Sequence, residues 1–199
     1  MALDHLLPLV LFSAVATLTP GGATTLATAS GAHFGFQRSV PLMTGIAAGL
    51  ASMAAAAAIG LTGMLLALPS LQLALKAIGT LYLLWLAWRI GRGGSPQMQK
   101  DLAAPTSFIG GMWLLWYNPK GWAMTSGAAA SFAALAGSPA ELAVLLATVF
   151  GIAAIVSLSL WCAAGQLLAR LLTADWQWRV LNLLLAFLLL ASIVPMWLP

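Results

Sequence analysis

Long apolar stretches occupy nearly the whole chain and constrain its fold more than any other feature. A helix of about 20 apolar residues spans the hydrocarbon core of a bilayer, whereas a membrane barrel alternates apolar and polar residues in segments of about 10. The stretches here are continuous and rich in Leu and Ala. We therefore predict an all-α integral membrane protein, a single transmembrane domain over residues 1–199. The six predicted transmembrane helices cover residues 5–28, 40–67, 70–90, 107–131, 141–169 and 177–197.

Composition and charge exclude several other classes of protein. Charged residues make up only 6% of the 199 residues, compared with about 25% in soluble domains, so a soluble globular domain is excluded. The formal net charge is +4, but the basic residues are scattered, whereas nucleic-acid binding needs them clustered on one face. The single cysteine, Cys162, permits no internal disulfide and no cysteine-based metal site. We expect no cofactor, no metal and no nucleic-acid partner.

The basic residues also predict the orientation of the chain in the membrane. Cytoplasmic loops of membrane proteins carry an excess of Lys and Arg. The basic residues outside the predicted helix interiors follow the first, third and fifth helices, namely Arg38, Arg89, Arg92, Lys100, Arg170 and Arg179. Both termini are therefore predicted to lie outside the cytoplasm. Because the apolar N-terminus lacks the basic start of a secretory signal, we expect it to be retained as the first helix.

A polar linker at about 91–106 divides the chain into two halves, 1–95 and 105–199, with three predicted helices each. The word LTPGG at 18–22 aligns with YNPKG at 117–121, and GIAA at 45–48 recurs at 151–154. Since three helices separate the copies, the second copy would run in the opposite direction across the membrane. We therefore predict an inverted-topology repeat.

Two motifs that contain both proline and glycine lie within the first and fourth predicted helices. They are Thr19-Pro20-Gly21-Gly22 and Asn118-Pro119-Lys120-Gly121. Proline removes a backbone hydrogen bond and clashes with the preceding turn, and glycine adds backbone freedom. Backbone groups freed at membrane depth are tolerated only inside protein or along a water-filled cavity. Both helices are therefore predicted to break, although prolines that merely kink them are the alternative.

Lys120 is the one charged residue predicted deep in the membrane. It lies about 13 residues into its helix, roughly 20 Å by helical rise, where a charge costs at least about 2.5–3.5 kcal/mol. The four acidic residues all fall at predicted helix ends or in loops, namely Asp4, Asp101, Glu141 and Asp175. The partner of Lys120 would then be an anion from outside the sequence, such as a substrate carboxylate, or carbonyls of a broken helix. The alternative is that Lys120 snorkels outward.

Other residues are explained more simply by packing or by the membrane interface. Small residues form one continuous face of the second predicted helix, which lets another helix approach closely: Gly45, Gly49, Ser52, Ala56, Gly60 and Gly63. Packing within the chain is the default, and a homodimer stays open. Aromatic residues near the fourth-helix word would line a cavity or face lipid, namely Trp113, Trp116, Tyr117 and Trp122. His33 is interpreted as an interfacial histidine rather than a proton carrier, and Lys76 as snorkelling.

Several of these sequence motifs resemble those of a known family. TPGGATTLATASGAHFGFQRSVPLMTGIAAG at 19–49, followed by Phe108 and NPKGW at 118–122, resembles the LysE/RhtB-type amino-acid exporters, which are small six-helix proteins of the bacterial inner membrane. The resemblance implies efflux of an amino acid or related small metabolite driven by a proton or ion gradient. In that membrane, the termini predicted from the basic residues would be periplasmic. The family has Pro-Gly-Pro in its first helix, whereas Gly22 replaces the second proline here, a change that softens the break and bears on the substrate.

The expected function is a secondary exporter with a midplane site between the first and fourth helices and alternating access. Thr19, Gly21 and Gly22 would supply backbone and hydroxyl groups, Asn118 an amide, and Lys120 the charge that binds a carboxylate. Pro20 and Pro119 would maintain the breaks, with Gly121 beside them. The partners would be a small solute and the lipid bilayer. The alternatives are an exporter of another small or inorganic solute and a non-transporting membrane subunit. We do not expect an intramembrane enzyme, because it would need a nucleophile with a base or a metal cluster, and two distant histidines without a buried acid supply neither.

Overall fold

The regular structure of the described residues is entirely helical. The computed structural model describes residues 2–60, 69–92, 107–191 and 193–194. Its helices follow in chain order as α1 (Ala2–Leu18), α2 (Gly22–Phe34), α3 (Phe36–Ala58), α5 (Pro69–Gly91), α6 (Phe108–Trp116), α7 (Pro119–Ser131), the short 3-10 helix η1 (Ala133–Leu135), α8 (Pro139–Leu171) and α9 (Asp175–Ala191). An all-α chain was predicted, and the described residues confirm it.

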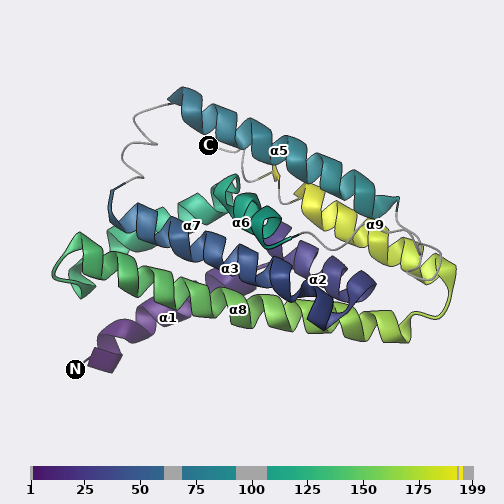
Figure 1. Ribbon diagram of the computed structural model, residues 1–199, viewed down its shortest axis with the longest axis horizontal. Helices are drawn as coiled ribbons and strands as arrows, with labels where there is room; N and C mark the ends of the chain where they lie inside the picture. Colours follow the sequence, from purple (N-terminus) through teal and green to yellow (C-terminus); the bar gives the residue numbers. More distant parts are fainter. Residues whose placement is uncertain (1, 61–68, 93–106, 192, 195–199) are drawn as a thin grey trace.

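Two long helices form the centre of the molecule. Helices α3 and α8 pack against each other along the long axis, and α5 and α9 pair along one flank (Figure 1). Helices α1 and α2 pack on α8, whereas α6 and α7 pack on α3. The largest fully buried side chains include Phe150 and Leu146 of α8, together with Leu42, Ile46 and Met53 of α3. The apolar core therefore lies where these two helices meet.

Both predicted helix breaks are confirmed. Helix α1 ends at Leu18 and α2 begins at Gly22, and the axes of this pair differ by 59°. Helix α6 ends at Trp116 and α7 begins at Pro119. We call residues 19–21 the first break and residues 117–118 the second break. Because proline lacks the N–H that a helix interior needs but is well suited to the first helical position, Pro119 restarts a helix rather than continuing one.

The prediction for the second helix was wrong at both ends. The expected helix over 40–67 begins at Phe36 and ends at Ala58. Gly35 and Gly60 have positive φ angles of 78° and 94°, which glycine adopts at little cost, so these two residues turn the chain where the apolar pattern continues. Gly60 is therefore not on the predicted helix face, and Gly63 lies outside the described residues.

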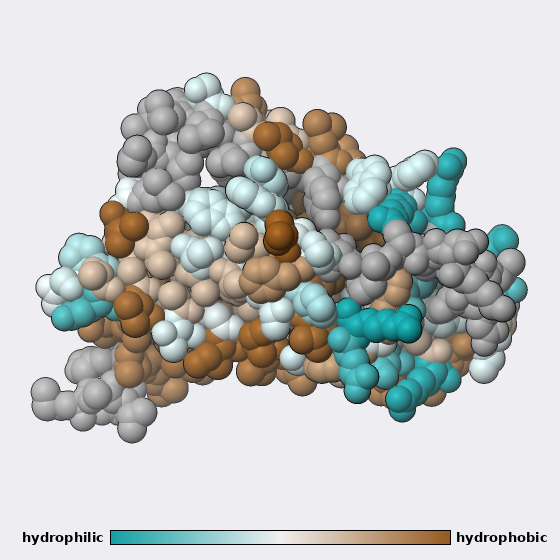
Figure 2. All heavy atoms as spheres, viewed as in Figure 1, coloured by the Kyte–Doolittle hydropathy of each residue, from teal (hydrophilic) through white to brown (hydrophobic). Residues whose placement is uncertain are grey.

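Length and apolar composition support a membrane protein. Among the described residues, Phe36–Ala58 and Pro139–Leu171 are each long and apolar enough to span a bilayer, and the bent pair Leu6–Leu18 and Gly22–Phe34 would count as a third span. A count of six spans stays a prediction. On the face in Figure 2, most strongly hydrophilic side chains gather toward the end where α8 leads into α9. This distribution is typical of a chain whose charges lie near one membrane surface.

Glycines bring two pairs of helices into close contact. A Cβ added to Gly45 of α3 would collide with the carbonyl of Phe108, and one added to Gly49 would lie 2.8 Å from the Met112 carbonyl oxygen of α6. Gly165 of α8 faces the Thr28 carbonyl of α2 in the same way. Backbones can approach this closely only where side chains are absent. Since α6 covers Gly45 and Gly49 within the chain, these two residues offer no support for a homodimer.

Candidate functional site

The first break leaves three successive carbonyls without helical partners, and side chains from elsewhere donate to each of them. The Ser157 hydroxyl donates to the Thr17 carbonyl at 2.7 Å, Trp161 Nε1 donates to the Leu18 carbonyl at 3.2 Å, and Lys120 Nζ donates to the Thr19 carbonyl at 3.0 Å. A helix end leaves its last carbonyls free, and an unpaired polar group in the membrane costs several kcal/mol. These donors therefore stabilise the broken conformation.

Ser157→Ala tests this stabilisation. Ser157 is only 1% exposed, so alanine should leave the Thr17 carbonyl with an unsatisfied acceptor site, at about 1–3 kcal/mol. We expect the melting temperature of the purified protein to fall by about 3–10 °C, given roughly 2–4 °C per kcal/mol for a chain of this size. The measurement is thermal unfolding in detergent. Ser159→Ala, on the same helix but outside the cavity lining, is the control, and an equal shift in both variants would contradict the assignment.

Helix α2 begins with a reciprocal hydrogen-bond pair. The Gly21 N–H donates to Thr24 Oγ1 at 2.8 Å, and the Thr24 hydroxyl donates to the Gly21 carbonyl at 3.0 Å. A Cβ added to Gly21 would lie 3.4 Å from Lys120 Nζ. The pair satisfies backbone groups at the helix start. The Lys120 ammonium lies beside Gly21, at a distance that an added Cβ would meet as an ordinary contact.

The second break is held by an N-cap and by two tryptophans. Asn118 caps α7, since its side-chain oxygen accepts from the Lys120 N–H at 3.0 Å. Trp116 Nε1 donates to the Ser52 hydroxyl at 3.2 Å, and Trp122 Nε1 donates to the Trp116 carbonyl at 3.0 Å. The cap satisfies an N–H that the helix itself cannot. Together these contacts direct α7, and with it Lys120, toward the first break.

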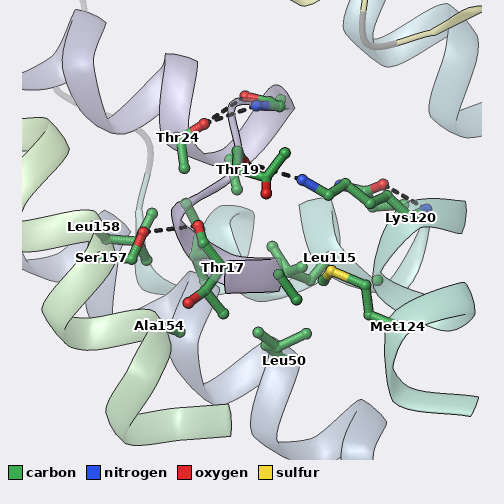
Figure 3. A pocket seen from close by; sticks show the side chains of 17 residues that line it. Thr17, Thr19, Thr24, Leu50, Leu115, Lys120, Met124, Ala154, Ser157 and Leu158 are labelled. Atoms are coloured by element: carbon green, nitrogen blue, oxygen red, sulfur yellow. Dashed lines mark hydrogen bonds between the residues drawn. The ribbon is translucent and has the colours of Figure 1, made fainter. Parts of the chain in front are cut away.

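A small cavity lies between the two breaks (Figure 3). Side chains of α1, α2, α3, α6, α7 and α8 line it, and Figure 3 shows Lys120 extending from α7 toward Thr19. Among the described residues that line the cavity, Lys120 is the one that is charged, and the others are apolar or bear a hydroxyl, apart from the amide of Asn118. The free volume of the cavity is about 40 Å³, room for roughly three waters. The arrangement can bind an anion, but a larger solute requires the surrounding helices to move.

The cavity brings together most of the predicted site residues. Its lining includes Thr19, Gly21, Gly22, Asn118, Lys120 and Gly121, while Pro20 precedes α2 in the first break and Pro119 opens α7. Of the two partners considered for Lys120, the structure has the carbonyl of a broken helix. The sequence reasoning missed Ser157 and Trp161, which lie about 140 residues away from the carbonyls they bind. The sequence did contain one indication of Ser157, because a serine follows each GIAA motif within seven residues, at Ser52 and Ser157.

Residues interpreted as packing or interfacial lie outside this cavity. His33 Nε2 is hydrogen-bonded to Asn182 Oδ1 at 3.0 Å, which joins α2 to α9. Trp113 and Tyr117 stack on each other with ring centroids 5.8 Å apart. The side chain of Lys76 lies outside the described residues. In the described part of the chain, no group of three or more His, Cys, Asp or Glu side chains could hold a metal ion.

Two broken helices that meet through one lysine charge and a free backbone carbonyl in an apolar bundle are typical of one class of protein, the helical membrane transporters. Comparison of the chain with models of known protein families identifies its family. The model of the LysE type translocator family matches residues 14–192, and the chain therefore belongs to that family. It is a membrane exporter of small solutes and not an enzyme. Neither a curated protein nor a solved structure matches the chain.

Proposed function

We propose that the protein is a secondary active exporter of an amino acid or a related small metabolite that carries a carboxylate. Its site is the cavity between the two breaks, near the bilayer midplane, in the bacterial inner membrane with both termini in the periplasm. The observation that carries the proposal is the Lys120 ammonium, which lies 3.0 Å from the Thr19 carbonyl oxygen of the other broken helix. Broken helices at membrane depth mark substrate sites in transporters.

The charge balance of the cavity supports a carboxylate as ligand. In the part of the chain that the structure describes, no acidic residue lines the cavity beside Lys120, and a carbonyl contributes only a partial negative charge to balance the ammonium. A charge kept inside a membrane protein at a cost of several kcal/mol is usually functional. Since the ammonium has no full counter-charge in the cavity, an anionic group on the solute supplies one.

The size of the cavity supports alternating access. Room for roughly three waters in about 40 Å³ is too little for an amino acid, so such a solute can enter only when the surrounding helices move. Lys120 and Thr19 close the gap between α7 and α1 directly. Opening therefore requires the broken helices to move apart on one side of the site, and the two breaks, where the helical hydrogen bonds are interrupted, are where such movement is easiest.

Corresponding contacts in the two halves support the inverted repeat. Each broken helix packs on the long helix of the other half. Helices α1 and α2 pack on α8, and α6 and α7 pack on α3. A serine of that helix also forms a hydrogen bond next to each break, Ser157 as donor to the Thr17 carbonyl and Ser52 as acceptor from Trp116 Nε1. Equivalent contacts in two halves are expected when both have the same fold. This pairing would let either half move against the other.

Solute counterflow tests the proposal. We expect purified protein in proteoliposomes preloaded with a mixed amino-acid pool to take up a labelled member of that pool with saturable kinetics, and an imposed pH gradient to change the rate. Exchange of amino acids establishes the substrate class. Folded protein that exchanges no amino acid contradicts it, and would favour an exporter of another solute or a non-transporting subunit.

A further inference from the structure

His33 forms the hydrogen bond that joins α2 to α9, and one of its ring nitrogens has no partner. His33 Nε2 lies 3.0 Å from Asn182 Oδ1. An amide oxygen only accepts hydrogen bonds, so Nε2 carries a proton and donates it. In the neutral imidazole Nδ1 is then an acceptor, and this atom is buried without a hydrogen-bond partner among the described residues. Buried polar atoms without a partner are rare, and each one needs an explanation.

The imidazole lies where two parts of the bundle meet. Helix α2 is packed tightly on α8, because a Cβ added to Gly31 would collide with the Cys162 carbonyl. Toward α9, by contrast, α2 presents the His33 ring, which is bonded to Asn182 and lies 5.6 Å from the Trp178 ring between centroids. Figure 1 shows α9 and its partner α5 on the other side of α2 from α8. The contact between α2 and α9 is therefore the one that a change at His33 can open.

We propose that His33 binds the proton that drives export, at Nδ1, and that this proton opens the contact between α2 and α9. Water delivers the proton, an Nδ1–H bond forms, Nε2 keeps its own proton, and the ring changes from neutral to positive. The ring later returns the proton to water on the other side of the membrane. This inference rests on the proposed function, since a secondary exporter needs a driving ion, and it goes further by assigning that ion to one atom.

A proton on Nδ1 does not fit the arrangement described above. The new N–H would be a charged donor at a buried position where the described residues offer it no acceptor, and an unsatisfied charged group costs more than a neutral one. The Trp178 ring can stabilise a cation, but it supplies no acceptor oxygen. The helices must then separate until water reaches Nδ1. Because a conformation that binds the proton better becomes more populated as pH falls, pH shifts the equilibrium between joined and separated helices.

Helix α2 connects this proton site to the cavity. Its first residue, Gly22, follows the first break directly and lines the cavity. His33 lies near the other end of the same helix, roughly 16 Å away by helical rise. The acidic residues whose side chains the structure describes, Glu141 and Asp175, lie in the first turns of α8 and α9 and are exposed. Among these titratable groups, His33 is therefore the one whose proton can move the first broken helix.

The other titratable and charged side chains on the helices packed against α2 do not bond to the imidazole. Apart from Glu141 at the far end of α8, the described ones are Arg38 of α3, Cys162 and Arg170 of α8, and Asp175 and Arg179 of α9. The arginines and Asp175 are exposed, where salt screens their charges. Cys162 is buried, but its sulfur faces Gly31, about 200° around the helix from His33. Proton binding by His33 is therefore governed mainly by the contact with α9.

Transport driven by a pH gradient tests the assignment. We expect wild-type proteoliposomes to accumulate a labelled amino acid against its concentration gradient, and His33→Gln to accumulate at least about tenfold less. Exchange at equal pH needs no proton binding and should fall by no more than about fivefold. His5→Gln removes the other of the two histidines and should accumulate solute like wild type. Normal accumulation by His33→Gln would overturn the inference. Loss of exchange at equal pH would overturn it too, because His33 would then belong to the solute pathway or to the fold.

Histidine NMR tests proton binding without any solute. Histidine-labelled protein in detergent has two sets of imidazole signals, since the chain has two histidines, and His33→Gln assigns them. We expect neutral His33 to carry its proton on Nε2 and to bind a second proton at Nδ1 as the pH falls. Asn182→Asp keeps the shape of the side chain but places a carboxylate beside Nε2, so it should move this transition to higher pH by about one unit or more.

Three NMR results would overturn the inference. They are a neutral ring with its proton on Nδ1, no second protonation over the pH range in which the protein stays folded, and an unchanged transition in Asn182→Asp. Failure of this inference can also be distinguished from failure of the proposed function, because counterflow at equal pH reports amino-acid exchange and the NMR titration does not. Exchange by a protein whose His33 binds no second proton would leave the exporter and overturn His33 as its proton site. Absence of exchange for the whole amino-acid pool would contradict both.

Discussion

Replacing Lys120 with alanine is expected to reduce solute counterflow at least about a hundredfold while leaving the protein folded. The variant loses the one charge among the described lining residues and the hydrogen bond that joins α7 to the first break. A hydrogen bond to a charged group is typically worth about 1.5–3 kcal/mol, or roughly 10–150-fold in affinity, and loss of the closing contact adds to this. The measurement is the initial rate of exchange at equal reconstituted protein.

Two further variants show whether the effect belongs to this position. Lys120→Arg keeps the positive charge but replaces a compact ammonium by a planar fork, so we expect partial activity. Arg92→Ala removes a positive charge at the end of α5, where the guanidinium lies 4.6 Å from the centroid of the Trp88 ring, and should exchange solute within about twofold of wild type. If Lys120→Ala exchanged solute at the wild-type rate, its assigned role would be wrong.

Stability should separate the function of Lys120 from a role in folding. Lys120 is half-buried, and a charge held within the membrane is unfavourable unless it is well paired. A neutral alanine removes that cost together with one hydrogen bond, so the melting temperature of Lys120→Ala should be close to that of wild type. A stable protein without transport would indicate a residue retained for its chemistry. A large loss of stability would instead indicate that the ammonium mainly holds the bundle together.

The positions of the two breaks could be predicted because their causes are local. Proline removes a backbone donor wherever it occurs in a helix interior, so the words at Pro20 and Pro119 were sufficient to locate them. Lys120 could be assigned to the interior for a similar reason, since the cost of a charge depends on its depth in the membrane. These inferences needed only the spacing of residues along one helix. That the two breaks face each other across one site was inferred with the help of the family resemblance and not from residue spacing.

The features that were missed depend on packing or on single backbone angles. Ser157 and Trp161 donate to carbonyls about 140 residues earlier in the chain, and one sequence has no local signal for such pairs. The end of α3 was misjudged because the apolar, small-residue pattern continues through Ile59 and Gly60. Hydropathy does not distinguish a glycine on a packing face from a glycine that turns the chain at positive φ. The sequence shows the same residue type in both roles, and only the three-dimensional structure distinguishes them.

The second large expected effect concerns the glycines that bring helices together. It is tested by comparing the glycines of the two GIAA motifs. Gly45 of the first word faces the Phe108 backbone so closely that an added Cβ would collide with the carbonyl, whereas a Cβ at Gly151 of the second word would lie 3.4 Å from the Ala51 Cβ, an ordinary contact. Gly45→Ala must therefore separate α3 from α6, which also disturbs the packing at Gly49 and Gly111. Overpacking typically costs about 1–3 kcal/mol and occasionally more, and rigid backbone on both sides favours the upper end.

We expect Gly45→Ala to lower the melting temperature in detergent by about 6–12 °C, at roughly 2–4 °C per kcal/mol, and Gly45→Leu to prevent accumulation of folded protein. Gly151→Ala should change the melting temperature by no more than a few degrees. Gly127→Ala, in α7 with no heavy atom within 4 Å of the added Cβ, should leave stability unchanged or raise it slightly, because alanine favours helix. Since the two GIAA words have the same sequence, unequal results at Gly45 and Gly151 can only come from what each glycine faces. Equal tolerance at both positions would mean that α3 and α6 do not pack as closely as the structure has them.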